Sequence, residues 1–396
     1  MRNIIVTGGE LFNKGAQAMT FIAVDEMKRR YPDHRILVLS EMDRERPEEE
    51  KNRYAFSFIG WYPVKFAACQ SNRILRSICQ LRNREELQEA ENIYGNTDLM
   101  IDISGYGLGS NWGLSGCNHY LEHLEFAKAF RIPVYLMPQS FGPFDFHGAE
   151  GKKMDERIGA LLASTKLICV REQEGYQALK THYHLDNVIL AGDLVLNNRG
   201  IEVKNIYRKV PKTTVPEIAP GSTALVPNQR NFEMADAHKV HHMYRHIICS
   251  LLKCGQNVYL VAHSSSDFGI CQDLKAAFAD EERVKLLDQD FSCLEFNELV
   301  RRFDFIVGSR FHAIVHAFKN GIPCVALGWA VKYHDLLEQF EQDAYMIDVR
   351  EETNDEQVTS IVRRMRERYM FESRIIKRHL EDYQHENVFD LIESLG

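Results

Sequence analysis

Residues 309–312 read Ser-Arg-Phe-His and form the strongest candidate in the chain for binding an anion. The largely apolar run Phe303–Val307 precedes them, and an amphipathic pattern begins at once, which predicts a strand feeding a helix through a tight turn. Arg310 and His312 then lie on the opening turn, where free backbone N–H groups and the helix dipole favour an anion. A cation and a titratable imidazole suit a phosphorylated or carboxylated ligand there. The alternative is that Ser309 only caps the helix and Arg310 is solvated.

A second turn suited to an anion opens the chain. Residues 7–16 follow the first expected strand and begin the first expected helix, with two adjacent glycines, Asn13 and Lys14. The glycines let the backbone approach a ligand, and Lys14 or free N–H groups can hold an anion. The pattern matches neither the dinucleotide motif GxGxxG nor the phosphate-binding GxxxxGK[ST]. A plain glycine turn capped by Asn13 is the alternative.

Acidic and neutral polar groups follow two other expected strands. Asp102 stands at the end of strand 99–103, where a general base or a ligand to a sugar hydroxyl can lie. Three alternating glycines follow it without the dinucleotide spacing. Gln139 and Ser140 come after the next strand and suit hydroxyl groups as neutral hydrogen-bonding partners. An aspartate that caps its loop and a simple turn at Gln139 are the alternatives.

Further charged residues complete the candidate set. Arg230 follows the first strand of the second half and is the second candidate for binding an anion. Asp193 follows another strand, and either Asp193 or the neighbours Arg171 and Glu172 can form an interdomain ion pair. Lys332 stands at an expected helix start and is assigned to substrate binding.

Two histidine arrays have helical spacing, but neither predicts a metal site. The first array has no acidic or cysteine partner nearby in sequence, which favours a solvated helix face: His238, His242 and His246. In the second, His312 and His316 share one stripe. Zinc hydrolases of the HExxH type need a glutamate after the first histidine, and Ala313 stands at that position. We therefore expect no metal.

Short apolar strands alternate with helical patterns almost throughout, which is typical of α/β folds with parallel sheets. Residues 198–222 break this alternation with charged residues and prolines. We predict two doubly wound, Rossmann-like domains with a cleft between the carboxyl ends of their sheets. The predicted parts are an N-terminal domain on the acceptor side (1–200), a linker (201–222), a C-terminal domain on the donor side (223–350) and C-terminal helices that can cross back (351–396).

The totals are those expected of a cytosolic protein. The chain has 396 residues and a net charge of −8 without a long basic block, which argues against nucleic acid or anionic lipid as the main partner. Nine cysteines lie mostly in apolar runs without a CxxC pair, as expected of reduced thiols. We find no signal peptide and no apolar run of about 18 residues.

Taken in order, these motifs resemble those of the polysaccharide pyruvyl transferase family. The resemblance rests on the following stretches: Asn13–Ala16, the glycine loop after Asp102, Gln139–Pro143, Arg171 with Glu172, Gly192 with Asp193, Ser309–His312, Gly321–Pro323 and Gly328. Each stretch is short, so the specificity lies in the ordered set across about residues 1–335. Members usually carry leucine between the arginine and the histidine. Here Phe311 keeps an apolar anchor but can alter the pocket.

The resemblance implies a GT-B-like fold and phosphoenolpyruvate as co-substrate, without a separate cofactor. It implies a pyruvate ketal placed on a sugar of a surface polysaccharide or of its lipid-linked precursor. His312 is expected to act as the acid or to stabilise phosphate, and Asp102 or Asp193 to deprotonate the acceptor. The catalytic set is thus His312, Arg310 and Asp102. The substrate-binding set is Arg230, Asn13, Lys14, Gln139, Ser309, Lys332 and Asp193.

The expected partners are phosphoenolpyruvate and a glycan or lipid-linked sugar acceptor, with room for a homo-oligomer. Acceptor contacts are expected from residues 44–96 and from the loops after Asp102 and Gln139. The protein is expected in the cytoplasm, with peripheral contact at the inner face of the membrane through the acceptor. Two alternatives stay open: a GT-B glycosyltransferase that uses a nucleotide sugar, and a non-catalytic sugar-binding subunit of polysaccharide assembly.

Overall fold

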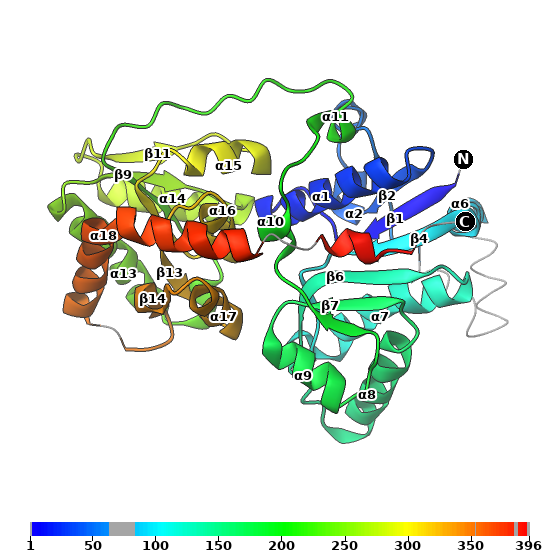
Figure 1. Ribbon diagram of the computed structural model, residues 1–396. Coiled ribbons are helices and arrows are strands. Elements are labelled where there is room, and N and C mark those ends of the chain that lie inside the picture. The colour runs from blue at the N-terminus through cyan, green and yellow to red at the C-terminus, as the bar shows by residue number, and fades with distance from the viewer. Residues whose placement is uncertain (1, 63–83, 353, 384–386, 394–396) are drawn as a thin grey trace.

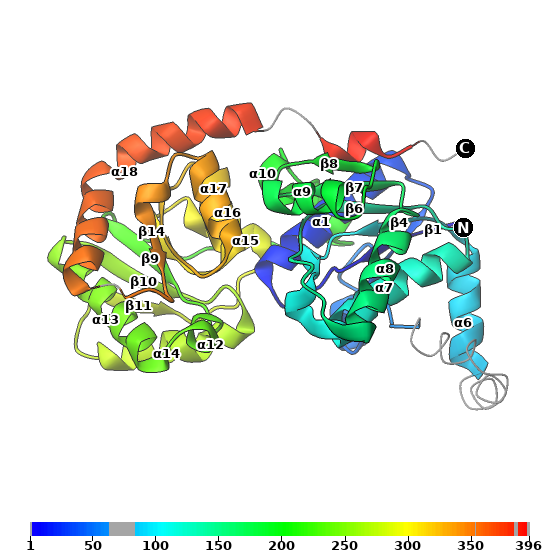
Figure 2. The ribbon, with the colours of Figure 1, turned by 90° about the horizontal axis from the view of Figure 1, so that it is seen from below.

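The computed structural model describes residues 2–62, 84–352, 354–383 and 387–393. Two α/β domains lie side by side, each built on one parallel sheet (Figures 1 and 2). The predicted fold class is therefore confirmed. Residues 63–83, part of the segment 44–96 from which acceptor contacts are expected, lie outside the described residues.

The N-terminal sheet has the strand order β3-β2-β1-β4-β6-β7-β8, and its pairs are parallel. The strands are β1 (Asn3–Thr7), β2 (Arg35–Leu39), β3 (Ser57–Ile59), β4 (Thr97–Asp102), β6 (Val134–Phe141), β7 (Leu167–Val170) and β8 (Val188–Leu190). The helices are α1 (Lys14–Arg30), α2 (Glu41–Arg44), α3 (Glu48–Lys51), α6 (Arg84–Gly95), α7 (Gly113–Ala129), α8 (Gly148–Leu162), α9 (Gln173–Thr181) and α10 (Leu194–Asn197).

The glycine loop after Asp102 contains a strand that the sequence did not predict. This strand, β5 (Tyr106–Leu108), pairs in parallel with the last residues of β6. Because of this pairing, β6 runs on to Phe141, and Gln139 and Ser140 are strand residues rather than turn residues. A short 3-10 helix, η1 (Ser110–Trp112), links β5 to α7.

The C-terminal sheet is also parallel and has the order β11-β10-β9-β12-β13-β14. Its strands are β9 (Ser222–Val226), β10 (Asn257–Val261), β11 (Val284–Leu287), β12 (Phe305–Gly308), β13 (Cys324–Gly328) and β14 (Met346–Asp348). The helices are α12 (Asn231–Met234), α13 (Ala237–Lys253), η2 (Ser265–Asp267), α14 (Phe268–Ala277), α15 (Cys293–Val300), α16 (Phe311–Lys319), α17 (Val331–Gln339) and η3 (Asp343–Tyr345).

One hydrophobic cluster runs through both domains. Successive strand residues point to opposite faces of a sheet, so each sheet packs on two helical layers. One face of the N-terminal sheet packs on α1, and one face of the C-terminal sheet packs on α15, α16 and α17, within the same cluster. The outer faces pack on α6 to α9 and on α13, α14 and α18 (Asp355–Tyr383). Helix α1 touches α15 and α16 directly, and α10 touches α16, so the domains share apolar contacts.

Two further segments join the domains, and both add residues to this cluster. The connection after α10 carries α11 (Val203–Ile206) and arches over one side of the molecule to reach β9 (Figure 1). At the other end, η4 (Val388–Leu391) lies on the N-terminal domain, where Asp390 pairs with Arg30 at 2.7 Å and the Asn387 amide donates to Glu26 at 3.1 Å. The chain thus ends against the domain in which it begins.

Neither disulfides nor a spanning helix contribute to this architecture in the described part of the chain. The seven cysteines described there are free thiols, five of them buried. Among the helices described, none is long and apolar enough to cross a membrane.

Candidate functional site

The strand ends that carry the candidate residues of the two domains meet at the interdomain contact. Asn13 follows β1 and Asp193 follows β8, whereas Arg310 and His312 follow β12 in the other domain. The imidazole of His312 lies against Gly15 on the first turn of α1, since a Cβ built there would be 2.4 Å from the ring. Only a glycine leaves room for this histidine.

His312 is the residue on which groups from both domains converge. Its Nε2 atom lies 3.8 Å from Oδ2 of Asp193 and, among described residues, has no hydrogen-bond partner although it is buried. Burial lowers the pKa of His312 to about 4; Asp193 opposes the shift, while Arg171 and Lys332 add to it. The imidazole is therefore neutral near pH 7, with one buried nitrogen available to a ligand.

Asp193 is held in place by its own domain. Its carboxylate accepts the backbone N–H of Val195 at 2.8 Å, which caps α10, and pairs with Arg171 at 3.0 Å. Burial alone would raise the pKa of Asp193, but His312 and Arg171 hold it below the usual value. The side chain is thus an ionised, oriented carboxylate facing His312. Of the two predicted interdomain contacts, Asp193 to His312 crosses the interface, whereas Arg171 pairs within the N-terminal domain with Asp193 and Glu172.

Arg310 is aimed by an aspartate that the sequence analysis missed. Its guanidinium donates to the two carboxylate oxygens of Asp267 at 2.8 and 2.5 Å, and to Ser266 at 2.9 Å. Asp267 is fully buried and belongs to a capping box with Ser264 in the turn after β10. The spacing Ser264-x-x-Asp267 behind a strand is the signal that could have found it.

Phe311 lies between cations from the two domains. Its ring is 4.6 Å from the guanidinium carbon of Arg171 and 5.2 Å from Nζ of Lys332. Burial lowers the pKa of Lys332 to about 8, and the nearby Arg171 contributes. Phenylalanine at the position where the family usually has leucine therefore gives these cations an aromatic face.

Lys14 and Asn13 open α1 against the C-terminal domain. The Asn13 side chain accepts the N–H of Gly15 at 2.9 Å, and its backbone pairs with Ser264 across the interface. Lys14 is buried, with Nζ 3.1 Å from Asp290. The Asn13 cap is therefore present, and the anion-binding role of this turn stays a prediction.

His263, which the sequence analysis also missed, lies beside this turn. Its backbone carbonyl accepts the N–H of Lys14 at 3.4 Å. The ring is fully buried, and neither nitrogen has a partner among the described residues. Burial holds its pKa well below the ordinary value, with Lys14 and His316 contributing. A single histidine after a strand carries no sequence signal for such a role.

Asp102 and Gln139 form a buried network inside the N-terminal domain. The Asp102 carboxylate accepts hydrogen bonds from the Thr7 hydroxyl at 2.8 Å, the Gln139 amide at 2.8 Å and the Ser104 hydroxyl at 2.9 Å. Burial raises the pKa of Asp102. Its acceptor positions are filled by neighbouring loops, so the geometry favours an organising role for Asp102, and its predicted role as a base stays a prediction.

Two predicted binding residues lie apart from this cluster. Ser309 is fully buried, and its hydroxyl is bonded to Tyr244 at 2.8 Å and Asn231 at 3.1 Å, so it faces neither a ligand nor the helix end. Arg230 is exposed and pairs with Glu233 three residues on in α12. In both cases the polar group is bonded to another residue of the C-terminal domain.

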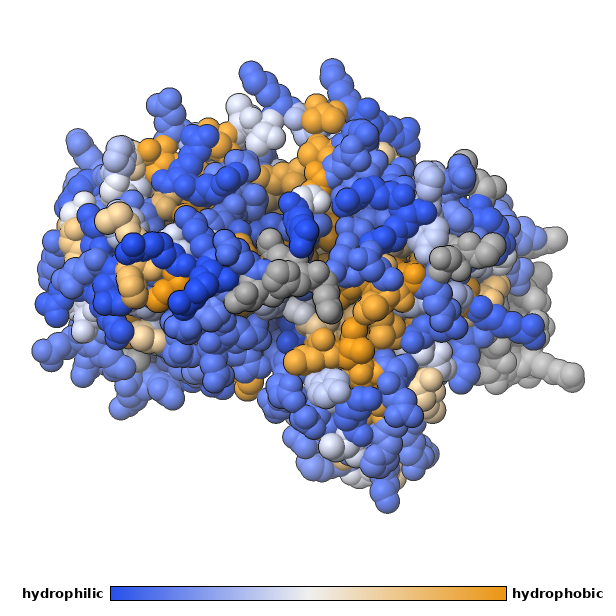
Figure 3. Space-filling model, in the orientation of Figure 1, coloured by the Kyte–Doolittle hydropathy of each residue, from blue (hydrophilic) through white to orange (hydrophobic). Residues whose placement is uncertain are grey.

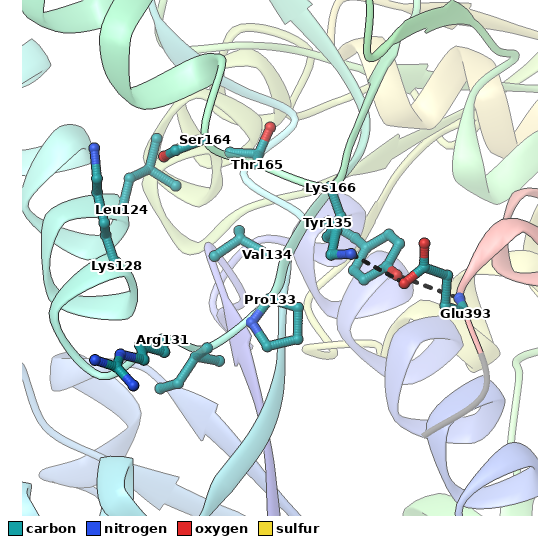
Figure 4. A pocket seen from close by; sticks show the side chains of 11 residues that line it. Leu124, Lys128, Arg131, Pro133, Val134, Tyr135, Ser164, Thr165, Lys166 and Glu393 are labelled. Atoms are coloured by element: carbon teal, nitrogen blue, oxygen red, sulfur yellow. Dashed lines mark hydrogen bonds and ion pairs between the residues drawn. The ribbon is translucent and has the colours of Figure 1, made fainter. Parts of the chain in front are cut away.

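A cavity of about 810 Å³ adjoins the cluster through Lys14. It is bounded by α1, α3, the interdomain connection and the start of α15, and lysine and arginine side chains line much of it: Lys14, Arg46, Arg53, Arg208, Lys209 and Lys212. By contrast, the pocket in Figure 4 lies where β6 and β7 begin, with Val134, Lys166 and Glu393 on its wall. That edge is opposite the strand ends carrying the motifs.

The first histidine array acquires an acidic partner in the folded chain. Asp355, at the start of α18, is 2.9 Å from Nε2 of His242 and 3.5 Å from Nδ1 of His246. These are the only three groups in the described residues with the spacing of metal ligands. They bond to each other on the surface and join α13 to α18, far from the candidate site in the fold (Figure 1).

Comparison with known proteins identifies the family of this chain. The family model described as Polysaccharide pyruvyl transferase matches residues 13–330, most of the chain. The chain belongs to this family. The match begins at Asn13 and runs through Asp193 and His312, so it contains both sides of the interdomain contact. No curated protein sequence matches the chain.

Solved structures confirm that this pyruvyl transferase family member has the GT-B-like arrangement. UGT71G1 of Medicago truncatula, complexed with UDP-glucose, is 11% identical with a TM-score of 0.55, over 97% of this chain and 94% of that one. The UDP-GlcNAc 2-epimerase of Methanocaldococcus jannaschii is 12% identical with a TM-score of 0.54, over 91% and 92%. At such identities the likeness concerns the fold alone.

Proposed function

We propose that this protein transfers a pyruvyl group from phosphoenolpyruvate to two hydroxyls of one sugar, forming a cyclic ketal. The acceptor is a sugar of a surface polysaccharide or of its lipid-linked precursor. Membership of the polysaccharide pyruvyl transferase family supports the class of reaction. The observation that carries the choice of donor is the set of cations and neutral imidazoles around Gly15, where the domains meet.

The donor brings a phosphate and a carboxylate, so it needs cations from more than one direction. Arg310, oriented by Asp267, and Lys332, over Phe311, supply two from the C-terminal domain. Lys14 supplies one from the N-terminal domain. The unpartnered Nε2 of His312 and both nitrogens of His263 are buried groups that a phosphate oxygen or an ordered water can satisfy.

The reaction requires one proton donor and two deprotonated hydroxyls. Protonation of the methylene carbon of phosphoenolpyruvate leaves an oxocarbenium-like C2, and the first sugar hydroxyl attacks it and loses its proton. The second hydroxyl then attacks C2 as the C2–O bond to phosphate breaks. Two C–O bonds form and one breaks. The two hydroxyls lose two protons: one offsets the proton that converts the methylene group to a methyl group, and the other leaves with phosphate or solvent.

His312 is the proposed proton carrier. Because burial keeps this imidazole neutral, the proton must arrive with the anionic donor, whose negative charge favours the imidazolium. Asp193 lies on the other side and stabilises that cation at 3.8 Å. We therefore assign Asp193 to the stabilisation of protonated His312. Asp102 and Asp193 are the two residues proposed as the general base for the acceptor hydroxyls.

The acceptor is proposed to enter from the N-terminal side. The cavity of about 810 Å³ touches Lys14 and is lined by six basic and four acidic side chains and by aromatic rings. The aromatic and acidic groups suit a sugar, and the basic groups suit phosphates joined to it. A lipid-linked acceptor would bring the protein to the inner face of the cell membrane. No separate cofactor enters this scheme.

The test is to incubate the protein with phosphoenolpyruvate and a panel of sugar diphosphates and lipid-linked oligosaccharides. We expect a product heavier by one pyruvate less one water, with equimolar phosphate release. Arg310→Ala should weaken phosphoenolpyruvate binding by roughly tenfold or more, whereas Arg230→Ala, an equal charge change at the exposed ion pair, should not. Acceptor binding without phosphate release would instead support the non-catalytic subunit.

A glycosyltransferase using a nucleotide sugar is the second candidate because the fold resembles UGT71G1 solved with UDP-glucose. The first turn of α17 holds no acidic residue to bind a ribose, and Lys332 stands there. A thermal-shift comparison separates the two, since a ligand of the folded state raises the melting temperature. Stabilisation by UDP-sugars but not by phosphoenolpyruvate would reverse our assignment.

A further inference from the structure

One face of α18 is buried and the opposite face is a basic surface. The buried side packs in the C-terminal core through Val358, Val362, Met365 and Ile376. Between positions 363 and 378 the opposite side, which we call the outer face of α18, consists of these exposed residues at helical spacing: Arg363, Arg364, Glu367, Arg368, Met370, Phe371, Arg374, Lys377 and Arg378. Figures 1 and 2 show this helix along the outside of the molecule, and Figure 3 shows strongly hydrophilic residues over it.

The charge of this face is opposite to that of the whole protein. The outer face holds six basic side chains and one acidic side chain, in a chain whose net charge is −8. Arg368 pairs with Glu372 and Arg378 with Glu341, whereas the other four cations, Arg363, Arg364, Arg374 and Lys377, form no ion pair with any residue that the structure describes. The total charge argued against an anionic partner, but the local stripe reverses that expectation at this face.

Two large apolar side chains stand among these cations. Met370 is 67% exposed and Phe371 is 45% exposed. Arg368 and Arg374 lie 4.6 and 5.7 Å from the Phe371 ring, so the aromatic group is framed by charge. A soluble polyanion would gain from the arginines alone, whereas the headgroup region of a bilayer takes up arginine and apolar tips together.

We propose that the outer face of α18 docks on an anionic lipid surface. The helix lies on the surface with its apolar tips at the headgroup level, and it does not span the bilayer. This binding is a property of the protein itself and does not depend on the reaction proposed above.

The same helix reaches the candidate site at its other end. Tyr383, in its last turn, accepts the backbone N–H of Asp193 at 2.5 Å, and Asp193 faces His312. If the proposed function holds, docking through α18 therefore brings the site to the surface that carries a lipid-linked acceptor. This second step rests on the proposed function, and the first does not.

The experiment measures co-sedimentation of the full chain with phosphatidylcholine vesicles, with and without about a third phosphatidylglycerol. We expect binding to the anionic vesicles only, weakened by salt because surface charges are screened. The triple variant Arg363→Glu, Arg374→Glu, Lys377→Glu should lose at least about tenfold in vesicle affinity. Its matched control is Lys128→Glu, Lys152→Glu, Lys153→Glu, the same charge change on exposed lysines of the N-terminal domain, which should still bind.

A second pair of variants tests the apolar part. Met370→Ser with Phe371→Ser should weaken vesicle binding several-fold, while Met42→Ser, at a side chain 61% exposed elsewhere, should not. Circular dichroism checks that each variant keeps its helices. Equal binding by the triple variant and its control overturns the proposal. So does binding to heparin as tight as to vesicles and unaffected by Met370→Ser with Phe371→Ser, which would make the face a polyanion site.

Discussion

At the scale of single residues, the site is organised around one imidazole whose place is set from both domains. Gly15 makes room for His312, and Asp193 faces its Nε2 atom. The ring is buried and neutral, so it is poised to gain a proton when an anion arrives. A histidine with a low pKa therefore suits the proposed reaction, which begins with the binding of an anionic donor.

Replacing His312 tests this role most directly. His312→Gln should lower turnover by roughly 10²–10⁴-fold, because glutamine can hydrogen-bond but cannot carry a proton. Binding of phosphoenolpyruvate to the wild type should take up a proton, since the anion raises the pKa of the imidazole from about 4. Calorimetry in buffers of different ionisation enthalpy measures this uptake, which the variant should lack. The exposed His334→Gln is the control, and a variant of His312 with normal turnover removes it from the mechanism.

Gly15 is the second residue whose substitution has a geometric consequence. In Gly15→Ala the new methyl carbon would lie 2.4 Å from the His312 ring, so the imidazole or the domain contact must shift. A displacement of about 1 Å can cost roughly 10²-fold in rate, and we expect such a loss with a retained fold. Turnover and circular dichroism measure the two.

The matched control is Gly269→Ala in α14, where the new methyl carbon meets nothing within 4 Å. It should leave turnover unchanged and can stabilise the helix by up to about 1 kcal/mol. Equal turnover in the two alanine variants would mean that the close approach at Gly15 has no part in activity.

At the scale of elements, the helices after the strands bring the charges together. α16 carries His312, α17 carries Lys332, and α1 carries Lys14, each within the first turn. Backbone N–H groups are unpaired at such helix starts, so cations placed there add to an existing preference for anions. Lys332 differs from Arg310 because burial lowers the pKa of Lys332 to about 8, so Lys332 loses its charge at a pH that ordinary buffers reach.

Lys332 predicts how donor binding changes with pH. Its pKa of about 8 means that it loses its charge as the pH rises through that value, while phosphoenolpyruvate stays fully ionised. Wild-type affinity should therefore fall by roughly tenfold between pH 7.5 and pH 9.5, the range expected for one lost charge-assisted contact. Lys332→Arg keeps a cation over Phe311 at high pH and should flatten this decline, although Lys319, with a pKa also about 8, leaves a residual slope. Lys239→Arg, an exposed position, should behave as the wild type in the same titration.

Most elements and their order could be predicted from the sequence, with β5 an exception, but contacts between distant elements could not. The sequence predicts strands at Asn3–Thr7 and Leu167–Val170 and helices at about Lys14–Arg30 and Gln173–Thr181. These are the observed bounds of β1, β7, α1 and α9, because apolar periodicity and turn residues are local signals. The ion pair between Asp267 and Arg310 could not be predicted, because the two residues lie 43 positions apart and the sequence around either one does not indicate the other. The hydrogen bond that holds the buried Ser309 hydroxyl comes from Tyr244, which lies 65 positions away in the sequence. Asp355 beside His242 is a third such case.

At the scale of the whole molecule, the domain interface combines an apolar core with buried titratable groups. One hydrophobic cluster continues from α1 to α15 and α16. His263, His312 and His316 lie in the same region, and each has at least one buried ring nitrogen without a partner in the described residues. A ligand between the domains would satisfy these groups, so we expect binding to stabilise the interface as a unit.

These histidines make the fold sensitive to acid, and the sign can be worked out. Burial lowers the pKa of His312 to about 4 and that of His316 to about 3, whereas both titrate near 6.5 when unfolded. Between those values the unfolded chain binds more protons, so the free energy of unfolding rises with pH and falls as the solution is acidified below about pH 6.5. Each histidine adds a slope of up to about 1.4 kcal/mol per pH unit in this window.

Denaturant titrations from pH 7.5 to pH 4.5 should therefore show a lower slope for His316→Gln than for the wild type, whatever its absolute stability. Carboxyls such as Asp102, whose pKa burial raises, contribute the opposite sign but equally in both proteins, so the difference isolates the histidine. His334→Gln should keep the wild-type slope, and parallel curves for His316→Gln and the wild type would mean that the buried ring does not titrate on unfolding.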